Sequence, residues 1–124
     1  MIIGALNADY EPIIQLTVRG NDGVVIQFDA VVDTGFNGFL TLPREILSRL
    51  GCQRLGLSRA TLATGTVELL DLFEVQMLWD RKLWRIEAEA VDDVPLIGMA
   101  ALLGYELRIE AKEGGAVTIS LLEE

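Results

Sequence analysis

Apolar and polar residues alternate along much of the chain, and a period of two is typical of strands with one buried face. The clearest example is Ile14, Leu16 and Val18, whose polar neighbours would face the other side of a sheet. Asn21-Asp22-Gly23 follows, and these residue types favour a hairpin turn because they tolerate positive φ. The same alternation marks four more segments, 24–30, 73–79, 84–90 and 105–111, and a turn at 113–115 leads into a last predicted strand, 116–121.

Two short helices are predicted between the strands. Pro43 suits a first helical position and Gly51 can end the helix that follows. A second, brief helix is expected from Gly98 to Leu103, because Gly104 would stop it. Many short strands separated by turn signals indicate a closed or strongly curled β-structure. The sequence therefore predicts a mainly β fold, in a single domain that covers residues 1–124.

Composition adds a hint of self-association and removes some partners. Apolar residues make up 51% of the chain, and with glycine they exceed the ~45–50% of ordinary domains. Excess apolar surface on a small domain usually becomes an interface. Ten basic and nineteen acidic residues give a net charge of −9, which argues against nucleic acid and against anionic membranes as partners.

The residue types that are missing exclude several kinds of chemistry. The chain has no histidine, so histidine-dependent nucleophiles and histidine-ligated metals are excluded. Cys52 is the single cysteine and is interpreted as a packing residue. Carboxylates are left as acid–base groups, and we expect neither a metal nor a cofactor. No apolar run approaches a membrane span, and the N-terminus lacks a basic leader, so we expect a cytoplasmic, soluble protein.

The segment Val31-Val32-Asp33-Thr34-Gly35 differs from the other acidic positions. Asp33 follows a continuous apolar run, which is typical of a strand covered on both faces. A carboxylate at that point would be partly desolvated, which suits it to proton transfer. The structural alternative is an aspartate that only closes the strand through an Asp-turn. These residues alone leave both interpretations open. The other acidic pair, Asp92-Asp93, is interpreted as a solvated turn.

Asp33-Thr34-Gly35 after a hydrophobic strand resembles the signature of the retroviral-type, retropepsin-like aspartic proteases and their single-domain prokaryotic relatives. Leu96-Ile97-Gly98 before a short helix is similar to the second signature of that family, two apolar residues and a glycine. Between them, the segment 60–67 around Thr64-Gly65 lies where the family has its flap hairpin. The pattern 33–43 resembles the prokaryotic branch in particular, and the likeness covers roughly residues 13–110.

The resemblance implies a closed acid-protease-type β-barrel of one lobe and a chemistry shared by two carboxylates. Two carboxylates a few ångströms apart cannot both ionise easily, so the pair holds one proton, as is established for aspartic proteases in general. The ionised carboxylate would take a proton from a water that attacks the peptide carbonyl. The protonated one would hydrogen-bond the carbonyl oxygen and assist departure of the nitrogen.

Individual roles follow from the same resemblance. Asp33 would be the catalytic carboxylate, Thr34 would hydrogen-bond across a two-fold axis, and Gly35 would let the backbone pass close to the pair. Retroviral members have alanine at the position of Phe36 and an arginine at that of Met99. The second signature would pack beneath the active-site loop. The residues expected at a substrate are Phe36, Ala63, Thr64, Gly65, Ile97 and Gly98.

The chain carries one such aspartate motif, so a pair of carboxylates needs a second copy. Two-fold homodimers place identical residues opposite each other on the axis. We therefore expect a homodimeric aspartic endopeptidase with peptide or protein substrates. The alternative is a non-catalytic β-barrel of the same fold that binds peptides or assembles partners. A small-ligand-binding barrel is a third interpretation, which no sequence feature supports.

Overall fold

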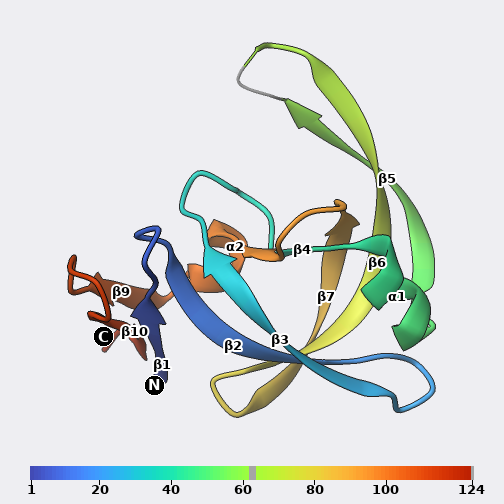
Figure 1. Cartoon of the computed structure of the whole chain (residues 1–124). Helices are drawn as coiled ribbons and strands as arrows, with labels where there is room; N and C mark the ends of the chain where they lie inside the picture. Colours follow the sequence, from blue (N-terminus) through green and yellow to red (C-terminus); the bar gives the residue numbers. More distant parts are fainter. Residues whose placement is uncertain (62–63, 124) are drawn as a thin grey trace.

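One continuous sheet of ten strands makes up most of the described chain, residues 1–61 and 64–123 of the computed structural model (Figure 1). The order of strands in the sheet is β5-β6-β7-β4-β8-β3-β2-β1-β10-β9. The strands are β1 (Ile2–Leu6), β2 (Pro12–Arg19), β3 (Val25–Val32), β4 (Leu40–Leu42), β5 (Gln53–Thr61), β6 (Val67–Trp79), β7 (Lys82–Ala90), β8 (Leu96–Ile97), β9 (Tyr105–Ile109) and β10 (Ala116–Leu121). The prediction of a mainly β chain is confirmed.

An additional pairing joins two strands that are far apart in this order. β2 pairs with β3 on one side and with the far end of β6 on the other, through Val18 and Met77. Strand pairing therefore runs from β6 through β7, β4, β8, β3 and β2 back to β6. The strands β1, β10 and β9 extend the sheet beyond β2, and β5 extends it beyond β6.

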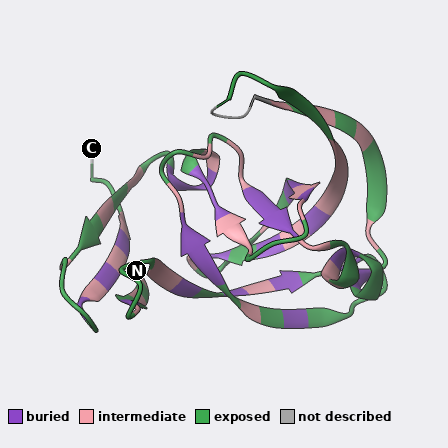
Figure 2. Cartoon of the chain, turned by 45° about the horizontal axis from the view of Figure 1, so that its top comes forward, coloured by how far each residue is buried: buried purple, intermediate pink, exposed green. Residues whose placement is uncertain are grey.

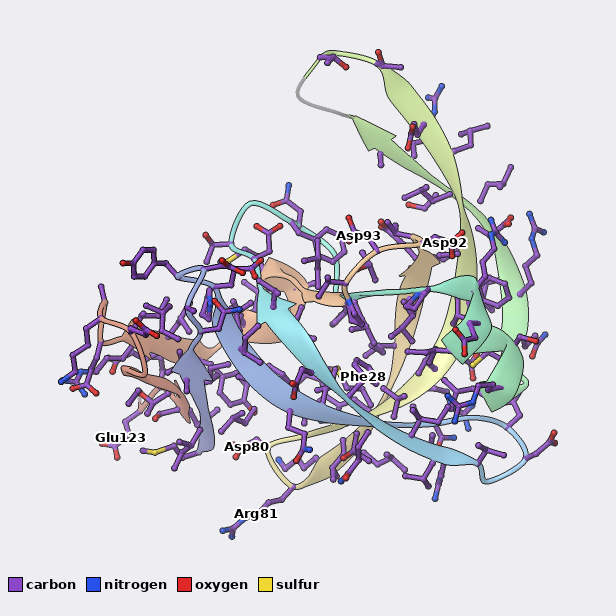
Figure 3. The ribbon with its side chains drawn as sticks, in the orientation of Figure 1. Phe28, Asp80, Arg81, Asp92, Asp93 and Glu123 are labelled. Carbon is purple, nitrogen blue, oxygen red and sulfur yellow. The ribbon has the colours of Figure 1, made fainter. Side chains whose placement is uncertain are left out.

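The hairpin predicted at residues 21–23 is present, and a second hairpin joins the predicted strands 73–79 and 84–90. Asn21-Asp22-Gly23 lies between β2 and β3, and Gly23 has a φ of +79°. Asp80 and Arg81 connect β6 to β7 with φ values of +48° and +70°, and Figure 3 shows both at this turn. Positive φ at both central residues gives the backbone twist that two-residue hairpins need.

Many side chains of the hydrophobic core come from the strands that the alternation predicts. Ile14, Leu16 and Val18 of β2 are almost completely buried, and so are Val75 and Met77 of β6. Figure 2 shows the resulting bands of buried and exposed residues along the strands. The period-two interpretation is thus confirmed for β2 and β6, whereas Val24 and Ile109, apolar positions of the alternating segments 24–30 and 105–111, are exposed.

Both predicted helices exist, with shorter bounds. Helix α1 (Arg44–Leu50) begins after Pro43, which is itself extended, and ends at Gly51 with a φ of +63°. Helix α2 (Met99–Leu102) is a single turn, with Gly98 before it and Leu103 after it. Neither helix in the described part of the chain is long and apolar enough to cross a membrane.

The strand β5 and the first half of β6 form an arm that projects from the rest of the sheet (Figure 1). In the sequence this half of β6 was not recognised, because only 73–79 alternates clearly. β6 in fact runs for 13 residues, from Val67 to Trp79. Val67 and Leu69 in the arm are at least half exposed, so burial imposes no regular pattern there.

Candidate active site

Asp33 stands at the end of a strand that is paired on both edges. β3 pairs with β2 through Val31 and Ile13, and with β8, in parallel, through Val31 and Leu96. Ala30, Val31 and Val32 are all buried, which confirms the expectation of a strand covered on both faces. The Asp33 N–H donates to the Ile97 carbonyl at 2.9 Å, and Asp33 itself is half-buried. The fold therefore fixes the main chain of Asp33 while leaving its side chain within reach of solvent.

A tight turn follows Asp33 and orients its carboxylate. The Gly35 N–H donates to Asp33 Oδ1 at 2.9 Å, and the Phe36 N–H donates to the Asp33 carbonyl at 3.2 Å. A Cβ on Gly35 would lie 3.2 Å from Asp33 Oδ1, so a side chain there would crowd the carboxylate. The Asp-turn of the structural alternative is thus present. Thr34 and Gly35 are exposed, at the surface of the single chain.

The second signature supports the loop 35–39 that follows the turn. A Cβ on Gly98 would lie 2.2 Å from the Gly38 carbonyl oxygen and 2.5 Å from Phe36 Cδ2, so only glycine fits against this loop. The Gly98 N–H donates to the Phe39 carbonyl at 3.0 Å. Ile97 is completely buried and Gly98 is also buried, so both lie beneath the loop, as the resemblance implies.

The first residues of α2 hold the loop through main-chain hydrogen bonds. The Met99 N–H donates to the Phe36 carbonyl at 2.8 Å, and the Ala100 N–H donates to the Gly38 carbonyl at 3.2 Å. These are main-chain bonds, so they do not depend on which side chain follows Gly98. Phe36 is half-buried over Gly98 and Gly38.

A buried hydroxyl joins the loop's far end to β8. Thr41 in β4 is only 4% exposed, and its Oγ1 accepts a hydrogen bond from the Leu96 N–H at 2.9 Å. Leu40 pairs with Ile97 in antiparallel register. The segments on both sides of the loop are therefore bound to β8.

The arm forms the opposite wall of a cavity over the loop. The cavity has a volume of about 350 Å³ and is lined by Gly35, Phe36, Asn37, Gly38, Arg59, Ala60 and Glu89. Of the expected substrate residues it contains Phe36. Thr64 and Gly65 are exposed beyond the end of β5, and Gly65 has a φ of +85°, the conformation that favours glycine. Ala63 lies outside the described residues.

Glu89 is a site residue that the sequence did not indicate. It is half-buried, and its Oε1 lies 3.3 Å from Ser58 Oγ of β5. Burial raises the pKa of the Glu89 carboxyl; the Ser58 hydrogen bond opposes this and the negative charge of Glu87 adds to it. In the sequence Glu89 alternates with alanines and looks like a solvent-facing acid. Only the parallel pairing of β7 with β4, with Thr41 opposite Glu89, brings it to the loop.

The other sequence interpretations can be placed as well. Cys52 is half-buried against the core, and burial raises the pKa of its thiol, in keeping with a packing residue. Asp92 and Asp93 are exposed in the loop after β7 (Figure 3). Asp92 Oδ1 accepts a hydrogen bond from the Arg44 N–H at 3.0 Å, at the start of α1. Across residues 1–61 and 64–123, no group of three or more acidic or cysteine side chains could hold a metal ion.

A solved structure with a similar fold is described as a retropepsin-like aspartic protease from Rickettsia conorii. The two chains are 21% identical and superpose with a TM-score of 0.61, over 98% of this chain and 91% of the other. No family model matches the sequence, and no curated protein matches it. At this level of identity the likeness concerns the fold, and the chain has a retropepsin-like fold.

Proposed function

We propose that the chain is an aspartic endopeptidase whose active site is shared by two copies of the chain. The observation that carries the proposal is the position of Asp33. It follows a strand paired on both edges, its turn is bound to the main chain, and the loop after it is braced by Gly98 and α2. Such support is what a catalytic carboxylate requires, because reacting groups must be held in a narrow range of geometry.

In this proposal the ring of strands is the closed acid-protease-type barrel, and the whole chain is one protease domain. Two copies of Asp33 face each other across a two-fold axis, and Thr34, exposed beside the carboxylate, lies in that interface. The pair holds one proton. The ionised carboxylate takes a proton from water, which attacks the peptide carbonyl, and the protonated carboxylate donates to the carbonyl oxygen.

The arm is the other half of the proposed site. A peptide would lie between the loop 35–38 and β5, in the cavity that Arg59 and Ala60 help to line. Gly65 and Thr64 would close over it. The cavity volume of about 350 Å³ is at the small end of the range for ligand sites, so the remaining room for a peptide would come from the second copy.

The first test is Asp33→Asn, with Asp29→Asn as its matched control. Asp29 is an exposed aspartate of β3, the strand that leads to Asp33, so its substitution removes the same charge away from the site. Cleavage of a diverse peptide library over about pH 3–8 should fall by ~10²-fold or more for Asp33→Asn and stay unchanged for Asp29→Asn. EDTA should have no effect on the unmodified chain. Full cleavage by Asp33→Asn would exclude Asp33 as the base.

The second test asks whether two chains share the site. Refolding equal amounts of unmodified and Asp33→Asn chains should give random pairs, about one quarter of them unmodified on both sides. Activity per unmodified chain should then fall to roughly half of the unmixed value. Activity that stays constant as variant is added would refute the shared site and would point to a second carboxylate within one chain. Peptide binding without any cleavage would instead support the non-catalytic module.

A further inference from the structure

The carboxylate of Glu89 lies between the arm and the loop, at the cavity that Glu89 helps to line. Its Oε1 lies 3.3 Å from Ser58 Oγ, and 3.4 Å from the place where a Cβ on Gly38 would stand. Glu89 therefore contacts the arm through Ser58 and lies beside Gly38 of the loop. Neither neighbour neutralises its charge, because a hydroxyl and a glycine carry none.

The cavity lining holds one acidic residue, Glu89, and one basic residue, Arg59. Alternation along β5 puts Arg59 on the strand face opposite Ser58, the residue that contacts Glu89, and Arg59 is exposed. Within the described residues, Glu89 takes part in none of the ion pairs with lysine or arginine. Glu87, two residues away on the same face of β7, adds charge of the same sign.

We propose that Glu89 forms a subsite for a lysine or arginine side chain of a bound peptide. A partly desolvated carboxylate gains most from a cationic hydrogen-bond donor, which restores the interaction that burial removed. An acidic side chain would add a second negative charge, and an aliphatic one would leave the carboxylate without a charged partner. The cavity volume suits one long side chain lying along the loop 35–38.

This inference rests on the proposed function only in that the site binds peptides, so binding and cleavage are measured separately. The binding probe is a randomised octapeptide library, applied at about 0.15 M salt to immobilised full-length chain carrying Asp33→Asn, which cannot consume it. The same chain with Glu89→Gln or with Glu87→Gln is compared. The Glu89→Gln substitution keeps the size of the side chain and a polar group for the Ser58 contact, and thermal denaturation checks that each variant folds.

Bound peptides should be enriched in lysine and arginine by about tenfold over the input library for the parent chain and for Glu87→Gln. The enrichment should disappear for Glu89→Gln. Equal enrichment in Glu89→Gln would show that the acidic surface in general attracts cations and would overturn the subsite, as would a lack of any peptide binding.

The unmodified chain is then incubated with the same library and the cleaved bonds are identified. Cleavage without a basic preference, together with unchanged binding by Glu89→Gln, would overturn the subsite while leaving the endopeptidase intact. If lysine and arginine are enriched among bound peptides in a way that depends on Glu89, but the chain cleaves no peptide, the subsite would stand and the endopeptidase would be refuted. The two proposals can thus fail independently.

Discussion

Gly98→Ala tests how tightly the loop after Asp33 is held. The added Cβ would lie 2.2 Å from the Gly38 carbonyl oxygen and 2.7 Å from that of Phe36. Both are main-chain atoms, and both accept hydrogen bonds from the start of α2, at 3.2 Å and 2.8 Å. The loop can make room for a methyl group only by moving away and weakening these bonds.

The expected loss in free energy of unfolding is about 2–4 kcal/mol, from overpacking a buried contact and weakening one or two hydrogen bonds. For a chain of 124 residues this corresponds to a melting temperature lower by roughly 6–16 °C. The displacement also moves the turn that carries Asp33. Since an error of about 1 Å in such a position can cost ~10²-fold in rate, peptide cleavage by the folded variant should fall by a similar factor.

Thermal denaturation followed by circular dichroism gives the first quantity, and kcat/KM well below the melting transition gives the second. Gly114→Ala is the control: no atom lies within 4 Å of its added Cβ, and its φ of +73° costs about 1–2 kcal/mol on its own. It should lose stability without losing activity per folded molecule. If Gly98→Ala melts at the same temperature as the parent, Gly98 is not packed tightly against the loop. If it is less stable but fully active when folded, this packing does not hold Asp33 in position.

Two further predictions concern pH and the arm. Hydrogen bonds from Arg44 and then Arg54 lower the pKa of Asp71, so this carboxylate stabilises the fold above its unfolded pKa of about 3.9, and the gain is lost as pH falls through the folded value. Asp71→Asn should therefore lower the melting temperature at pH 7 and converge with the parent only when the pH falls below the folded pKa of Asp71. Burial raises the pKa of Glu89, so the ionised form of this carboxylate destabilises the fold above that pKa. Glu89→Gln should therefore raise the melting temperature at pH 7 but not below about pH 4, where the carboxyl is protonated in both states. A higher melting temperature at pH 7 for Asp71→Asn, or a lower one for Glu89→Gln, would contradict the pKa shift of that residue. Gly65→Val, at a φ of +85° in open space, should reduce turnover more than stability, and unchanged turnover with a sharply lower melting temperature would mean that the segment is a structural hairpin.

Sequence reasoning worked where burial leaves a periodic trace. The alternation from Ile14 to Val18 gave a correct strand because one face of β2 packs into the core. The apolar approach to Asp33 likewise reflects burial on both faces of β3, where Ala30, Val31 and Val32 are all buried. Where side chains are exposed, or where an element has only a few residues, the sequence shows no periodic pattern that predicts a strand. β8 has only two residues, Leu96 and Ile97, and was recognised through the family resemblance alone.

The features that sequence reasoning missed depend on contacts between distant segments. The N-terminal strand β1 was not expected, because its residues make a strand by pairing with β10 and β2. The arm half of β6 is exposed on much of its surface and so shows no alternation. Glu89 looks solvent-facing in its own strand and enters the cavity only through the parallel pairing of β4 and β7. Such parallel neighbours leave no local turn signal.

The arm is connected to the rest of the sheet by one continuous strand, β6. One end of this strand pairs with β2 and β7, and the other carries β5 over the loop. If the distance between the arm and the loop changes, the paired strands β5 and β6 must bend. The hydrogen-bond ladder between these two strands is interrupted at the register shift between Arg54 and Gly56. At that point Asp71 of β6 binds Arg54 and, from α1, Arg44, at 3.0 Å and 2.8 Å. The base of the arm is thus held by partly exposed charges, which salt screens, so we expect high ionic strength to weaken this support.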